Sequence, residues 1–157
     1  MGWLARLHGP GSAPDPLAED GLSALTLLAV LEEAVSYLDA AEALLERCAL
    51  AGDPGHPTGA RPADTRLGVV EARQGLRLRV AFTQLSRWLD GMVCEPEQEG
   101  LRADTSRLLR FYLLMISSAL DAAFTPPSRQ HIAVRGGNGS AARRLVELRD
   151  LARAAVE

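Results

Sequence analysis

The sequence contains no lysine, so all 17 of its positively charged residues are arginine. This absence excludes mechanisms that depend on a lysine amine, such as Schiff-base catalysis or a phosphate-loop lysine. Aromatic residues make up only 4% of the chain, and the net charge is -3. Because nucleic-acid-binding proteins usually combine a basic face with stacking rings, this composition argues against nucleic acid as a partner.

Cysteine and histidine are also scarce. Cys48 and Cys94 stand far apart without a CxxC motif, and we expect small buried residues in a reducing compartment, although the sequence leaves a disulfide open. The histidines His8, His56 and His131 fall in predicted loops. Zinc sites group Cys and His, and di-metal bundles carry Glu-x-x-His on core helices. We therefore expect no metal and no cofactor.

Motifs of enzymatic chemistry are missing as well. The chain has no Walker motif, no serine elbow and no dinucleotide loop. The alternating acids of residues 94–100 (CEPEQEG) lack the Gly and the Asp or Asn of a calcium loop, so a solvated connector is expected. The glycine-rich RGGNGS of residues 135–140 follows no strand, and we interpret it as a loop with Ser140 as N-cap. The protein is predicted not to be an enzyme, with catalysis by an unrecognised carboxylate pair as the alternative.

Long apolar runs are absent too. The most hydrophobic stretch, residues 104–124, contains an uninterrupted apolar run only from Phe111 to Ile116. A membrane span needs about 20 such residues. The N-terminus lacks the apolar core of a signal peptide. We therefore expect no membrane insertion and a cytoplasmic protein.

What the sequence does contain is helical periodicity. Residues 104–124 carry two apolar seams with steps of three and four, which predict a central core helix capped by Asp104 or Thr105 and ended by Pro126-Pro127. The same spacing predicts long helices over residues 17–50 and 64–93 and a shorter one over 140–156, separated by loops.

The predicted fold is all-α: an antiparallel four-helix bundle with three long helices and one shorter C-terminal helix. Residues 1–15, rich in Gly and Pro, are expected to form a flexible N-terminal tail, and residues 16–157 the helical bundle domain. The second helix is basic and could lie against the acidic first helix, and Gly75 marks a possible kink within it.

Several segments, in this order, resemble the flagellin export chaperone family, FliS. The stretch VLEEAVSYLDAA (residues 30–41) resembles the family's Leu-Tyr-Asp-Gly-Ala-Ile-x-Phe-Leu helix, and TQLSRWLD (residues 83–90) its segment before an acidic connector. Leu108, Tyr112 and Met115 resemble its Asn-Leu-x-x-Leu-Tyr-x-Tyr-Met helix, and LVELRDLAR (residues 145–153) its C-terminal ending. Together these matches extend over roughly residues 22–155.

The resemblance implies a chaperone that holds the disordered C-terminal segment of flagellin and prevents its polymerisation before export. Such a client would fold onto apolar grooves of the bundle. The apolar residues that helix packing leaves over, and hence the predicted partner-binding residues, are Val69, Leu76, Val80, Phe111 and Leu114.

Two other functions stay open. Residues 77–89 (RLRVAFTQLSRWL) resemble the second helix of RcdA, which implies a helical adaptor in regulated proteolysis. Alternatively, the extra apolar face is a homodimer interface. The oligomeric state, monomer or homodimer, does not follow from the sequence.

Overall fold

A computed structural model describes residues 16–51, 67–124 and 139–157. Within these ranges the chain is helical and contains no strand, so the all-α prediction is confirmed. The helices are α1 (Pro16–Ser36), α2 (Leu38–Ala51), α3 (Val69–Gly91), α4 (Pro96–Phe124) and α5 (Ser140–Ala154). Residues 1–15, 52–66 and 125–138 lie outside the described residues. They hold the expected tail, most of the loops expected over residues 51–63 and 125–139, and the first three residues of the helix expected over 64–93.

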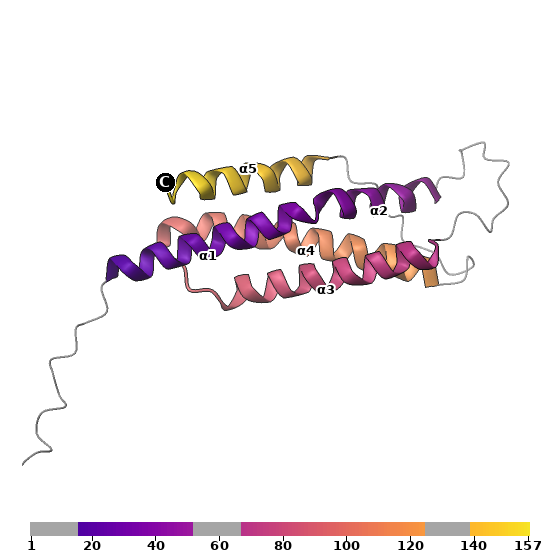
Figure 1. Ribbon diagram of the computed structural model, residues 1–157, viewed down its shortest axis with the longest axis horizontal. Helices are drawn as coiled ribbons and strands as arrows, with labels where there is room; N and C mark the ends of the chain where they lie inside the picture. The colour runs from indigo at the N-terminus through magenta and orange to yellow at the C-terminus, as the bar shows by residue number, and fades with distance from the viewer. Residues whose placement is uncertain (1–15, 52–66, 125–138) are drawn as a thin grey trace, which may run out of the picture.

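The helices pack side by side along a common direction (Figure 1). α3 and α4 form an antiparallel hairpin, α2 continues the line of α1, and α5 runs back along α1. α4 packs against each of the other four helices, as expected for the most hydrophobic segment. This packing is that of a helical bundle.

The first predicted helix is in fact two, because the chain breaks at Tyr37. There the Tyr37 N–H donates to the carbonyl oxygen of Ala34, at 3.2 Å, which is an i to i-3 bond. The Ser36 hydroxyl donates to the carbonyl oxygen of Glu33 at 2.6 Å. Side-chain bonds of this kind compete with the regular ladder and bend helices.

The fourth helix begins earlier than predicted. Residues 94–100 were expected to be a connector, but α4 starts at Pro96. Proline suits the first helical position because it has no N–H to leave unpaired, and Glu97 and Glu99 complement the positive helix N-terminus. The predicted caps Asp104 and Thr105 therefore lie inside the helix, where the Thr105 hydroxyl donates to the Leu101 carbonyl oxygen at 2.7 Å.

Two other boundaries also differ from the prediction. α3 spans Val69–Gly91, whereas the sequence predicted a helix over residues 64–93. Ser140 is not the N-cap of α5 but its first helical residue. The cap position is Gly139, whose φ of 70° lies in the left-handed region that glycine adopts without steric cost.

Most residues of the predicted apolar seams are buried together in the core. Phe82 of α3 stacks on Tyr112 of α4 with ring centroids 5.5 Å apart, and both side chains are fully buried. Gly75 lies within the continuous helix α3, where a Cβ atom would come within 2.7 Å of Leu120 Cδ2 and 3.2 Å of Leu44 Cδ2. The glycine thus serves close packing of α3 against α4 and α2.

Candidate protein-binding surface

The outward side of α3 mixes apolar and basic residues along one line. Val69, Arg73, Leu76, Val80 and Arg87 are spaced by four, three, four and seven residues, and all five are exposed. Such spacing places side chains on one side of a helix. We call these five residues the α3 stripe.

The arginines of α3, two of which belong to the α3 stripe, are not neutralised by the described part of the bundle. In the described part of the chain, no carboxylate pairs with Arg73, Arg77, Arg79 or Arg87. α3 does pack against α1 and α2, as the sequence suggested for the basic second helix, but among the described residues these four arginines form no ion pair across that contact. The ion pair between α2 and α3 has the opposite polarity, with Arg47 on α2 and Glu71 on α3.

α4 contributes Leu114 to the same side of the molecule. Arg110 of α4 pairs with Asp90 of α3 at 3.1 Å, which identifies the edges where the two helices meet on the outside. Leu114 follows Arg110 by one turn. The Phe82–Tyr112 stack and the approach of Gly75 to Leu120 set the register of the antiparallel pair, which puts Leu114 level with Val80.

Phe111 lies on a different edge of α4. It follows Asp104 by two turns, and Asp104 pairs with Arg144 of α5, so this edge is turned toward α5. The Phe111 ring meets Tyr112 edge-on, with centroids 5.6 Å apart. Phe111 therefore adjoins Leu114 at one-turn spacing but is separated from the α3 stripe.

All five residues predicted to bind a partner are exposed in the folded chain. The exposed fractions are 71% for Val69, 38% for Leu76, 55% for Val80, 38% for Phe111 and 65% for Leu114. Their role in binding stays a prediction. The sequence reasoning missed Trp88, which is 62% exposed on α3. Its place next to Leu89, and hence off the buried seam, was the signal that could have found it.

A shallow polar depression of about 450 Å³ lies near the C-terminal end of α3. Its arginines are already engaged: Arg102 with Glu99 and the Leu89 carbonyl oxygen, Arg107 with Asp104, and Arg110 with Asp90. Because each guanidinium already pairs with a carboxylate of the protein, the depression is a poor site for a further anion. The lining residues are Asp90, Arg102, Ala103, Ser106, Arg107 and Arg110.

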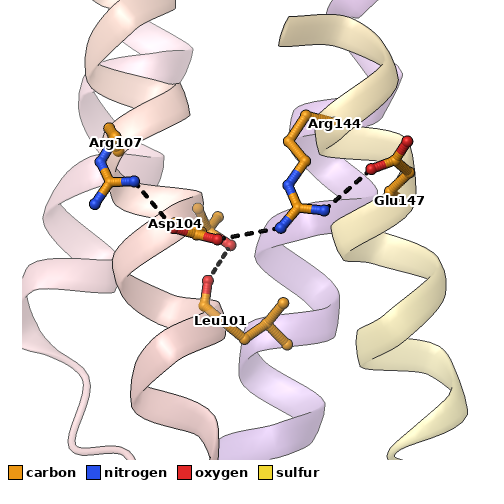
Figure 2. A network of polar contacts seen from close by, with 6 residues as sticks. Leu101, Asp104, Arg107, Arg144 and Glu147 are labelled. Carbon is orange, nitrogen blue, oxygen red and sulfur yellow. Dashed lines mark hydrogen bonds and ion pairs between the residues drawn. The ribbon is translucent and has the colours of Figure 1, made fainter. Parts of the chain in front are cut away.

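An ion-pair network fastens α5 to α4 (Figure 2). The Asp104 carboxylate accepts from Arg107 on its own helix and from Arg144 on α5, each at 3.2 Å. Arg144 also pairs with Glu147 at 3.0 Å. These residues are partly exposed, so the network orients the helices more than it stabilises them.

Among the described residues, the fold raises the pKa of both cysteines and both tyrosines. Burial raises the pKa of the Cys48 and Cys94 thiols, which keeps both protonated and weakly nucleophilic at neutral pH. Both cysteines are free. Burial and a hydrogen bond to Glu42 raise the pKa of Tyr112, and a hydrogen bond to Glu33 raises that of Tyr37.

Among the described residues, no group of three His, Cys, Asp or Glu side chains is placed to hold a metal ion. The helices of the described ranges also include none with the length and apolar character needed to cross a membrane.

The chain matches no protein-family model, and the comparisons with curated proteins and with solved structures gave no match either.

Proposed function

We propose that this protein is a binding module of the chaperone type, which holds an amphipathic segment of another protein against α3 and α4. The observation that carries the proposal is the exposure of Val69, Leu76, Val80 and Leu114 on one side of a folded bundle. Exposed apolar residues that gather on one side are typical of interaction sites.

The bundle architecture suits this function. We count α1 and α2 as one helix broken at Tyr37 and thus propose an antiparallel four-helix bundle with three long helices and a shorter C-terminal one, which the packing of α3 with α4 and of α1 with α5 supports. The groove between neighbouring helices offers a seat for a partner helix, whose apolar side covers the exposed residues. A client that is disordered when free loses conformational entropy on binding, so the complex remains releasable.

The resemblance to flagellin export chaperones suggests the client. Under this proposal, the C-terminal segment of flagellin is held in the cytoplasm and kept from polymerising until export. The order of the resembling segments supports this identity, and the exposed residues of α3 and α4 provide the surface.

Calorimetric titration with the C-terminal ~50 residues of a flagellin from the same genome tests the proposal. We expect saturable binding of about one client per chain, a negative heat-capacity change and a gain of helix by circular dichroism, because apolar burial and coupled folding produce these signatures. Leu76→Asp and Leu114→Asp should abolish binding and retain helical content. Leu151→Asp is the matched control, because Leu151 is 55% exposed but lies on α5.

Absence of heat at high micromolar client, with a folded protein, would rule out flagellin as client. Equal loss of binding in Leu151→Asp would show that the effect is not specific to α3 and α4. A homodimer through the α3 stripe is disfavoured, because a two-fold interface would bring the unpaired arginines of both copies together.

A further inference from the structure

We propose that the segment held by the α3 stripe is an acidic amphipathic helix. Its carboxylates pair with Arg73 and Arg87 of the stripe and with Arg77 beside it, and its apolar residues cover Leu76 and Val80. This inference rests on the proposed function, because it specifies the chemistry of the client that the surface takes.

The distribution of ion pairs is the first argument. The described ranges contain twelve arginines. Five of them make no ion pair there, and four of these five lie on α3, the fifth being Arg143 of α5. The other seven pair with carboxylates: Arg47, Arg102, Arg107, Arg110, Arg144, Arg149 and Arg153. Unpaired positive charge is thus concentrated on one helix of an acidic protein.

The acids of α3 do not offset this charge. Glu71 is engaged by Arg47 and Asp90 by Arg110, both from neighbouring helices. Asp121 of α4 follows Leu114 by two turns on the same side, and within the described residues it pairs with no arginine. One such acid beside Arg73 and Arg87 of the α3 stripe, with Arg77 at its edge, leaves the surface with an excess of positive charge.

The geometry of the stripe is the second argument. From Val69 to Arg87 it covers 19 residues, so the two ends are 18 steps of 1.5 Å, or about 27 Å, apart. Its apolar pair Leu76 and Val80 lies between Arg73 and Arg87. A partner helix of similar length fits this order if its apolar residues occupy the middle and its carboxylates flank them. Arginine suits such pairing because its guanidinium can bind a carboxylate through two N–H groups.

Other occupants fit the surface less well. A second copy of the chain would bring like charges together. A membrane-surface helix usually inserts bulky residues such as Trp, Phe and Leu, whereas the stripe offers one leucine and two valines. The protein helix is therefore the occupant that matches both the charge and the modest apolar area.

Two designed 18-residue peptides test this inference. Both carry leucines at i, i+3, i+4 and i+7, flanked by Glu in one and by Lys in the other, and both are labelled for fluorescence anisotropy with the full-length protein. We expect the acidic peptide to bind at least about tenfold more tightly at low salt, and salt to narrow the difference because it screens exposed charges. The triple variant Arg73→Gln, Arg77→Gln, Arg87→Gln should weaken binding of the acidic peptide about tenfold and should not weaken binding of the basic one.

Arg143→Gln is the matched control, because Arg143 is also exposed and unpaired among the described residues but lies on α5. This variant should bind the acidic peptide as tightly as the wild type does. Equal affinity for both peptides would overturn the acidic preference and leave the proposed function standing. If the flagellin segment binds and neither peptide does, the inference fails alone. If none of the three binds to the folded protein, the proposed function fails with it. Flotation with phosphatidylserine vesicles, without binding of the acidic peptide, would also overturn it in favour of a lipid surface.

Discussion

The Tyr112 hydroxyl donates a hydrogen bond to Glu42 Oε1 at 2.5 Å, joining α4 to α2 across 70 positions of sequence. The Tyr112 ring is fully buried and stacks on Phe82, whereas Glu42 is only partly buried. The phenol therefore ends at the edge of the core, where it reaches a carboxylate without forcing that charge into the interior.

This bond predicts a loss of stability at alkaline pH. The folded-state pKa of Tyr112 is raised above the ordinary value of about 10, so the folded chain holds its proton longer than the unfolded chain does. The resulting stability is complete below pH ~10 and is lost as pH rises above it. Without lysine, the side chains that titrate near this range are the tyrosines and the two cysteines. Urea unfolding should show a lower free energy of unfolding at pH 11 than at pH 8.

In Tyr112→Phe, the free energy of unfolding should fall less between pH 8 and pH 11. At pH 8 it should be lower than in the wild type by about 1 kcal/mol, the usual contribution of one hydrogen bond. Tyr37→Phe is the comparison, because its hydroxyl bonds Glu33 at 2.6 Å on the exposed surface. An unchanged pH profile in Tyr112→Phe would show that Tyr112 does not govern the alkaline transition.

Replacing Ser86 of α3 by alanine should stabilise the protein. Its hydroxyl oxygen is buried and has no hydrogen-bond partner among the described residues. Removing an unsatisfied polar group and gaining helix propensity should raise the free energy of unfolding by about 0.5–1 kcal/mol. Thr105→Ala should instead lower it by about 1–2 kcal/mol, because the equally buried Thr105 hydroxyl is bonded to Leu101. Chemical denaturation measures both, and a loss of stability in Ser86→Ala would indicate a partner for that hydroxyl.

Two glycines inside helices should respond oppositely to alanine. Gly100 of α4 has open space where a Cβ atom would be added, so Gly100→Ala should stabilise by up to about 1 kcal/mol through helix propensity. At Gly75 the added carbon would collide with Leu120 in the core, and overpacking costs about 1–3 kcal/mol. Thermal unfolding should therefore give a lower midpoint temperature for Gly75→Ala than for Gly100→Ala. Equal stabilisation by both would show that α3 and α4 separate without cost.

Two leucines of α5, one buried and one exposed, should differ in how much they contribute to the stability of the bundle. Leu148 is buried against the bundle, and Leu151, one turn later, is exposed. Leu148→Ala should cost about 2–4 kcal/mol of unfolding free energy, whereas Leu151→Ala should stay within about 0.5 kcal/mol. Similar small effects at both positions in denaturant titrations would mean that α5 adds little to the stability of the bundle.

Helix existence and the buried seams followed from periodicity. Leu78, Phe82, Leu85 and Leu89 recur at helical spacing and are all buried, because one side of each helix must leave water. Boundaries were less accurate. The early start of α4 at Pro96 depends on a proline at the first turn, which the sequence reasoning interpreted as part of a loop. The break at Tyr37 arises from local side-chain bonds that apolar spacing does not reveal.

The sequence by itself determined the helical class, the core-facing seams and the five apolar residues left outside them, since periodicity records which side of each helix avoids water. Only the tertiary structure decided how these residues are grouped. The Asp90–Arg110 pair and the Gly75 contact place Leu114 beside the α3 stripe, and the Asp104–Arg144 pair places Phe111 toward α5. The tertiary structure also decided which charges pair, because pairing depends on which helix edges meet. For this reason four arginines of α3 have no carboxylate partner among the described residues.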